Sequence, residues 1–293
     1  MLQNIKLGFN GRFFPEMWRP AIEEIAFAQD AGFKSLQFIG KEEGLDENDL
    51  GAPFGDVRTA FEQAGIVPVM ELLVRIAKNG RSAKGNRPID VLHNNLPAIQ
   101  GLGCVCVHWH LTQPGFRADN ELGWAMEEWD DATSVALETV LQSQLKEAVA
   151  LGQQNGFLFG IEHNAPDLST FFHSPERMDA ALTAVPDLGL VWDFNHPTLE
   201  QQLDFKKLAN RVSMLHLSDA PLPKVNWHLP VGKGAVDFVA CFQSLLMSGF
   251  SGPAILEIGG TPWSGGFGQD SDENLIQSKQ RIEQAIRQAG QIA

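Results

Sequence analysis

The feature that most constrains the fold is a regular alternation of strand-like and helix-like segments along the chain. Apolar runs such as KLGFN, VPVMELL, CVCVHWHL and LGLVWDFNH are each followed by a segment with apolar residues at helical spacing. Strands that alternate with helices pair in parallel, and the helices form the crossovers. Eight such units fill the chain without a linker or a break in composition. We therefore expect an α/β fold, a single (β/α)8 barrel domain over residues 1–293.

A doubly wound open sheet is the alternative arrangement. Such sheets usually have fewer strands, and those that bind dinucleotides carry a glycine-rich turn after the first strand. The segment GFNGRF, which follows the first expected strand, lacks that pattern. Capping residues support the expected helices: Ser174, Thr198 and Asp237 precede three of them, and Gly65 and Gly156 follow two others.

The charge of the chain bears on its partners. The formal net charge is −14, whereas binding to a phosphate backbone depends on clustered Lys and Arg, so we expect no nucleic-acid partner. One basic segment, VRIAKNGRSAKGNRP from Val74 to Pro88, is an exception. It is either a solvated loop or a cationic lid over an anionic substrate.

Other features bear on the compartment. No run of about 18 apolar residues is present, so we expect no membrane-spanning helix. The start of the chain, MLQNIKLGFNGRF, lacks the basic-then-apolar layout of a signal peptide, and we expect a cytoplasmic protein. Cys104, Cys106 and Cys241 are too few for a disulfide framework, and we expect buried free thiols.

Acids and imidazoles recur at the C-terminal ends of the expected strands, where the active site of such a barrel is built. Any one of them could be a structural ion pair or a satisfied core histidine. Together they would repel one another, or would be costly to bury, unless a cation lies among them. These residues are Glu71, His108, His110, Glu162, Asp193, His196, His216 and Glu257.

Four of these residues form the metal site that we expect. Glu162, Asp193, His216 and Glu257 come from four successive strands and supply three carboxylates and one imidazole. Such a mostly oxygen ligand set suits Mn²⁺, Mg²⁺ or Co²⁺ better than Zn²⁺. We therefore expect one divalent metal ion as the cofactor.

Five segments also carry a resemblance to a known family, namely GIEHN, VWDFNHP, LHLSD, HLPVGKGAVDF and ILEIGG, in this order. With them the chain resembles the xylose isomerase-like TIM-barrel superfamily. That superfamily contains sugar isomerases, hydroxypyruvate isomerase, ketose 3-epimerases, related dehydratases and endonuclease IV. The resemblance covers essentially the whole chain. The pattern is specific for the superfamily and poorly specific for the substrate.

The resemblance also implies roles. Glu162 and Glu257 would be the catalytic acid and base as well as metal ligands. His196, three residues after the ligand Asp193, would bind a substrate hydroxyl, and His108 would face the substrate.

Four further residues complete the substrate pocket that we expect: His110, Glu71, Trp109 and His228. His228 begins the segment HLPVGKGAVDF. Trp109 would offer an aromatic face to the C–H groups of a sugar, and the alternative is that it merely packs at the end of the barrel.

Two departures from the family pattern concern the substrate. Epimerases of this family place an arginine a few residues beyond the metal-binding histidine that here is His216. This chain has only Lys224 and Lys233 in that stretch. Endonuclease IV has an Asp-x-His where this chain has Asn226-Trp227-His228, and asparagine is a poor zinc ligand. We therefore do not expect a three-zinc site.

These expectations lead to an enzyme that isomerises or epimerises a small ketose or hydroxy-keto acid through an enediolate. Its partner would be a small-molecule carbohydrate. A homo-oligomer is a further possible assembly, because many barrels of this family associate through their helices. The first alternative is a metal-dependent dehydratase (a lyase) of a keto-sugar or an inosose-type ring at the same site. Two weaker hypotheses are an abasic-site nuclease and a non-catalytic binding protein.

Overall fold

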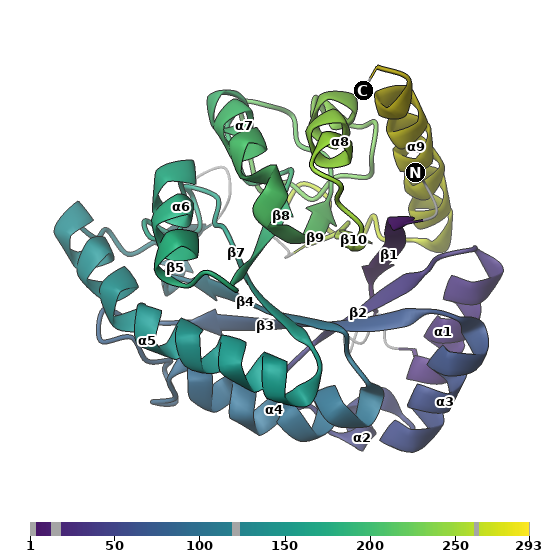
Figure 1. The fold of residues 1–293 in the computed structure, drawn as a ribbon, viewed down its shortest axis with the longest axis horizontal. Helices are drawn as coiled ribbons and strands as arrows, with labels where there is room; N and C mark the ends of the chain where they lie inside the picture. Colours follow the sequence, from purple (N-terminus) through teal and green to yellow (C-terminus); the bar gives the residue numbers. More distant parts are fainter. Residues whose placement is uncertain (1–3, 13–18, 119–123, 261–263, 293) are drawn as a thin grey trace.

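The computed structural model describes residues 4–12, 19–118, 124–260 and 264–292. Eight parallel strands close into a barrel in the order β1-β10-β9-β8-β7-β4-β3-β2, and helices surround it (Figure 1). The predicted (β/α)8 barrel is therefore confirmed. The barrel strands are β1 (Lys6–Asn10), β2 (Ser35–Ile39), β3 (Val67–Arg75), β4 (Cys106–Thr112), β7 (Leu158–Glu162), β8 (Gly189–Asp193), β9 (Val212–Leu217) and β10 (Pro253–Leu256).

The helices begin where the capping residues predict. The side chains of Ser174, Thr198 and Asp237 each accept a hydrogen bond from a backbone N–H in the first turn of the following helix. Two others end at Gly65 and Gly156, which adopt the left-handed conformation that glycine allows. The helical segments are α1 (Ala21–Asp30), α2 (Glu47–Leu50), α3 (Phe54–Ala64), α4 (Pro88–Leu102), α5 (Asp131–Asn155), α6 (Pro175–Ala184), α7 (Leu199–Phe205), η2 (Lys206–Arg211), α8 (Phe238–Met247) and α9 (Asp272–Ile292).

One feature of the connection between β4 and α5 was not expected. Strands β5 (Gly115–Arg117) and β6 (Trp124–Met126) pair antiparallel and form a small sheet of their own outside the barrel order. Each has three residues, which is too short for the apolar–polar alternation that identifies a strand in a sequence.

The interior of the barrel has an apolar layer beneath a polar one. Residues two apart on a strand face the same side, and each member of the apolar layer lies two positions before an acid or histidine of the predicted site. These acids and histidines therefore form one polar layer nearer the C-terminal ends of the strands. The apolar layer consists of Val69, Cys106, Val191, Met214 and Ile255.

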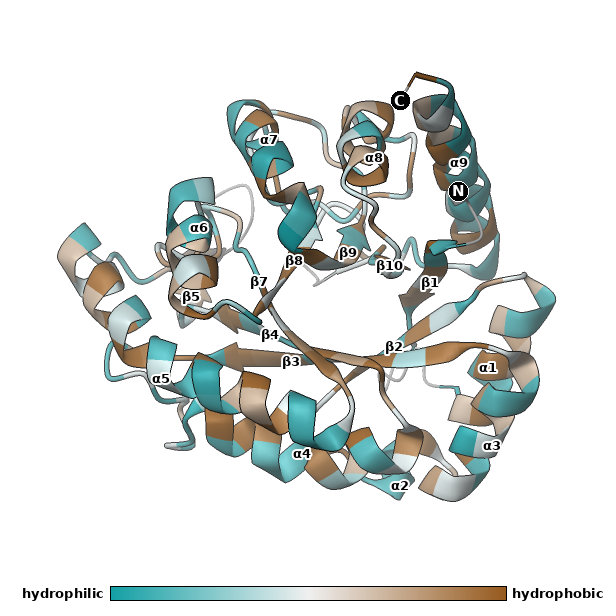
Figure 2. Ribbon diagram, in the orientation of Figure 1, coloured by the Kyte–Doolittle hydropathy of each residue, from teal (hydrophilic) through white to brown (hydrophobic). Residues whose placement is uncertain are grey.

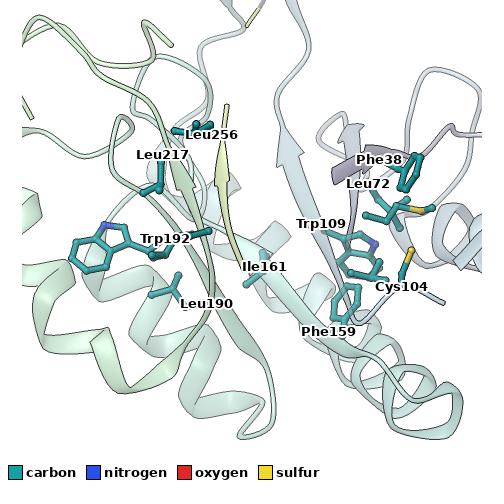
Figure 3. Close-up of a cluster of buried hydrophobic side chains, with 14 of the residues drawn as sticks. Phe38, Leu72, Cys104, Trp109, Phe159, Ile161, Leu190, Trp192, Leu217 and Leu256 are labelled. Carbon is teal, nitrogen blue, oxygen red and sulfur yellow. The ribbon is translucent and has the colours of Figure 1, made fainter. Parts of the chain in front are cut away.

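The main core lies between the barrel and the helices. Trp109 and Phe159 pack edge to face there, with ring centroids 4.9 Å apart, and Figure 3 shows these rings beside Cys104 and Leu72. The helices show polar stripes on their outer surfaces (Figure 2). The three cysteines are buried and free, as expected. Within the described part of the chain, no helix combines the length and apolar character needed to cross a membrane.

Candidate metal centre and active site

His216 lies at the centre of the polar layer. Its Nδ1 atom is 3.0 Å from Oε1 of Glu162 and 3.2 Å from Oε2 of Glu257. Asp193 stands directly opposite His216 in the register of β8 and β9. The barrel thus brings together the four predicted metal ligands, and one ligand atom of each lies within 4.8 Å of the others.

The donor set fits a cation because each carboxylate keeps an oxygen without a hydrogen-bond partner. These oxygens are Oε2 of Glu162, Oδ2 of Asp193 and Oε2 of Glu257, and all three are buried. A buried carboxylate oxygen without a partner is costly, and the cost disappears when it coordinates a metal ion. The geometry therefore suits one divalent cation held by Glu162, Asp193, His216 and Glu257.

The electrostatics point the same way. Burial raises the pKa of Asp193 well above its usual range, and the charges of Glu162 and Glu257 raise it further. Burial alone would also raise the pKa of Glu162, but the neighbouring His110 and His216 hold it well below the usual range. The raised pKa of Asp193 reflects the negative charge of Glu162 and Glu257 beside it, which a divalent ion would balance.

Three further predicted residues, from β3 and β4, gather near Glu162. Nε2 of His108 and Nδ1 of His110 are each 3.4 Å from Oε2 of Glu162. Nδ1 of His110 also contacts Oε1 of Glu71 at 3.2 Å. Burial opposes the charged imidazole of His110, yet Glu162 and Glu71 raise its pKa to about 9. His110 is therefore a cationic neighbour of Glu162.

His196 and His228 lie on the β8 and β9 side. Nδ1 of His196 donates to the backbone oxygen of His163 at 2.9 Å, so its Nε2 carries the lone pair. That Nε2 is buried without a hydrogen-bond partner, 3.4 Å from Oδ2 of Asp193. His228 donates through Nδ1 to the backbone oxygen of Glu257 at 2.9 Å. Both imidazoles are thus oriented by backbone carbonyls beside metal-ligand candidates.

Trp109 does not belong to this site, and the structure corrects the expectation. His108 and His110 point into the barrel, so the intervening Trp109 points to the opposite face of β4. There it is fully buried against Phe159 in the core between barrel and helices. Its indole is therefore unable to line a pocket inside the barrel.

The structure adds two residues that the sequence reasoning missed. Gln37 on β2 is fully buried and contacts both His216 and Glu71. The signal was a glutamine in the middle of the apolar stretch SLQFI. Asp167 lies in the loop after β7, and burial raises its pKa to about 6, with His228 opposing the shift. Nothing in the local sequence distinguished Asp167 from an ordinary loop acid.

The segment HLPVGKGAVDF is held in place by Asp219. Its carboxylate accepts hydrogen bonds from the backbone N–H groups of Gly232 (2.7 Å) and Val236 (3.1 Å). Gly234 is required by close packing, because a Cβ there would lie 2.4 Å from the backbone oxygen of Ala220. These contacts give the two glycines and Asp219 a structural role in shaping the loop after β9.

Most of the cations of the basic segment have local partners. Lys84 pairs with Glu43 at 2.8 Å and Arg87 with Asp90 at 2.6 Å. Arg81 donates to the backbone oxygen of Gly85, and Lys78 lies 6.0 Å from the centroid of the Trp129 ring. These contacts favour a solvated loop over a cationic lid.

Comparison with curated proteins gives partial matches. L-ribulose-5-phosphate 3-epimerase UlaE of Shigella boydii is 27% identical over 109 residues, which is 36% of this chain and 34% of that protein. The Salmonella paratyphi A enzyme of the same name is 32% identical over 75 residues, which is 25% of this chain and 24% of that protein. The alignment therefore spans about a third or less of the curated relatives' length.

Solved structures show the fold over almost the whole chain. L-ribulose 3-epimerase superposes with a TM-score of 0.72 at 15% identity and covers 97% of this chain and 95% of its own. D-psicose 3-epimerase of Clostridium cellulolyticum gives 0.67 at 13%, covering 96% and 98%. The Escherichia coli 3-keto-D-glucoside 4-epimerase gives 0.68 at 16%, covering 94% and 99%.

The family model described as the xylose isomerase-like TIM barrel matches residues 25–287. This stretch begins within α1 and ends within α9, so it includes seven of the eight barrel strands and all four proposed metal ligands. The chain belongs to the xylose isomerase-like TIM barrel family.

Proposed function

We propose that the protein is a divalent-metal-dependent epimerase or isomerase of a small ketose or hydroxy-keto acid. The observation that carries the proposal is that Glu162 and Glu257 both contact Nδ1 of His216, at 3.0 and 3.2 Å. Each of these glutamates retains a buried oxygen without a hydrogen-bond partner. The epimerases with similar folds supply the substrate class.

The two glutamates are suited to moving one proton. A bound cation would supply Lewis-acid polarisation of a substrate carbonyl, which acidifies the neighbouring C–H bond. One glutamate removes that proton, and the other returns a proton to the opposite face of the carbon, which inverts its configuration. The configuration of the substrate decides which of Glu162 and Glu257 is the base.

His196 is suited to orienting the substrate. Its Nδ1–H group is committed to the backbone oxygen of His163, so its buried Nε2 can accept a hydrogen bond from a hydroxyl group. Burial lowers the pKa of His196 well below its usual range, with Glu162 opposing the shift, so the imidazole is neutral and remains an acceptor.

The donor set also bears on the metal. Three carboxylates and one imidazole form a hard ligand set, which favours Mn²⁺, Mg²⁺ or Co²⁺ over Zn²⁺. We propose one such ion per chain as the working cofactor.

The test begins with metal analysis of the purified protein, followed by proton-exchange assays in deuterated water over a panel of ketoses. The panel includes free sugars and their phosphates. Comparing the two tests whether the basic segment Val74–Pro88 binds phosphate. We expect one divalent ion per chain and deuterium incorporation at the carbon beside the carbonyl of at least one ketose. Product analysis distinguishes epimerisation from the elimination that a dehydratase would catalyse. A metal-free protein that exchanges no proton with any ketose, and gains neither property when metal is added, would contradict the proposal.

A further inference from the structure

Gln37 joins the candidate metal centre to Glu71 through both ends of its side-chain amide. Its Nε2 donates to Oε2 of Glu71 at 3.0 Å, and its Oε1 lies 3.0 Å from Nε2 of His216. An ionised carboxylate only accepts hydrogen bonds, so the NH₂ end of Gln37 must face Glu71. The carbonyl end is then left for His216 and requires a hydrogen on Nε2. Gln37 thus fixes Nε2 of His216 as a hydrogen-bond donor.

The amide belongs to a closed circuit of contacts. His216 continues through Nδ1 to Oε1 of Glu162 at 3.0 Å, and Oε2 of Glu162 lies 3.4 Å from Nδ1 of His110. His110 returns to Oε1 of Glu71 at 3.2 Å. All five side chains are buried, and Gln37 is the one member whose donor end and acceptor end do not depend on its protonation state.

We infer that Gln37 is the positioning residue that makes His216 a metal ligand through Nδ1. With a hydrogen fixed on Nε2, the lone pair of a neutral His216 lies on Nδ1, which faces Glu162 and Glu257. Metal-binding histidines generally donate their second N–H to such a partner, and loss of the partner weakens metal binding by about 10- to 100-fold. The inference rests on the proposed metal centre.

The first test replaces the amide with an apolar side chain of similar length. Gln37→Met keeps the volume and removes both hydrogen bonds, and we expect Mn²⁺ to bind about 10- to 100-fold more weakly. Gln202→Met is the matched control, because Gln202 is also buried and donates to the backbone oxygen of Phe194 at 3.2 Å, outside the circuit. We expect the control to retain the wild-type Kd. An unchanged Kd in Gln37→Met would overturn the inference.

The second test exchanges the two partners. In Gln37→Glu/Glu71→Gln the carboxylate at position 37 accepts from His216. The amide at position 71 then donates to that carboxylate and accepts from His110. Each hydrogen bond to a histidine keeps its direction and the net charge is unchanged, so we expect the Kd for Mn²⁺ to return to within about twofold of wild type. A folded double variant as weak as Gln37→Met would show that hydrogen-bond direction is not the cause.

The third readout is spectroscopic and needs no substrate. In the zinc-loaded, ¹⁵N-labelled protein we expect a solvent-protected hydrogen on Nε2 of His216 in the wild type and in the double variant. We expect that signal to exchange rapidly with water in Gln37→Met. A hydrogen on Nδ1 of His216 in the wild type, or full protection in Gln37→Met, would overturn the inference. A wild-type protein that bound no divalent metal would contradict both the proposed function and this inference. Metal binding that Gln37→Met leaves unchanged would contradict only the role of Gln37.

Discussion

Nδ1 of His216 and Oε1 of Glu162 lie 3.0 Å apart, although the residues are 54 positions apart in the sequence. Burial opposes the charged form of each, yet the neighbouring carboxylates raise the pKa of His216 well above its usual range. Glu257 and Asp193 complete the proposed ligand set around this pair.

We expect Glu162→Gln and Glu257→Gln each to reduce the rate of solvent-deuterium exchange into the substrate by about 10²- to 10⁴-fold. This is the usual loss when a general acid or base is removed. The measurement is made at saturating Mn²⁺ with bound metal quantified, because both residues are also proposed ligands. Circular dichroism checks that the variants are folded. Retained exchange in both variants would rule out the two-carboxylate scheme.

Removal of metal should lower the thermal stability of the protein. A ligand that binds only the folded state at 100 times its Kd adds about 2.7 kcal/mol to the free energy of unfolding. We expect Mn²⁺ to raise Tm and a chelator to reverse the change. In Asp193→Asn, which loses one proposed ligand charge, this shift should shrink or vanish. A full Mn²⁺ shift in that variant would exclude Asp193 from the site.

Trp109→Phe should separate packing from catalysis. The indole is fully buried against Phe159 on the outer face of β4, so the smaller ring leaves a cavity. We expect the free energy of unfolding to fall by about 0.5–3 kcal/mol, measured by urea denaturation. Metal affinity and KM should stay at wild-type values. A large rise in KM with unchanged stability would return Trp109 to the substrate pocket.

Gly234→Ala should destabilise the loop after β9. The added Cβ would lie 2.4 Å from the backbone oxygen of Ala220, and we expect a loss of about 1–3 kcal/mol in the free energy of unfolding. Gly55→Ala is the control, because a Cβ at this helical position meets no atom within 4 Å. That substitution should be neutral or stabilising by up to about 1 kcal/mol. Equal effects at the two positions would show that the close approach is unimportant.

The Arg12 and Arg19 contacts to Asp272 should be lost in acid. Burial opposes ionisation of Asp272, but hydrogen bonds from Arg12 and Arg19 lower its pKa below the usual value. A lowered folded-state pKa means that the stabilisation is present above the unfolded pKa of about 4 and disappears as the pH falls through the folded pKa. Asp272 is 44% exposed in its side chain, so we expect Asp272→Asn to lose at most about 1 kcal/mol at neutral pH. The difference from wild type should close below about pH 4; a difference that stays constant into acid would contradict this account.

The pattern of the sequence predicts the barrel well because its physical signals are local. The alternation of apolar runs and helical periodicity depends on neighbours along the chain, and capping residues such as Ser174 and Thr198 act within one turn. The hairpin of β5 and β6 left no such signal. Trp109 could have been placed correctly, because a residue between two inward histidines must face outward on a strand.

The sequence alone determined which strand ends carry the four ligand candidates Glu162, Asp193, His216 and Glu257. It could do so because the two-residue period of a strand fixes which side chains share a face. The tertiary structure decided which partner each atom has. Gln37 shows the difference: it is one polar residue within an apolar strand, and it meets His216 only because β2 and β9 belong to one closed barrel. Contacts across a barrel depend on strand order and stagger, which no local pattern records.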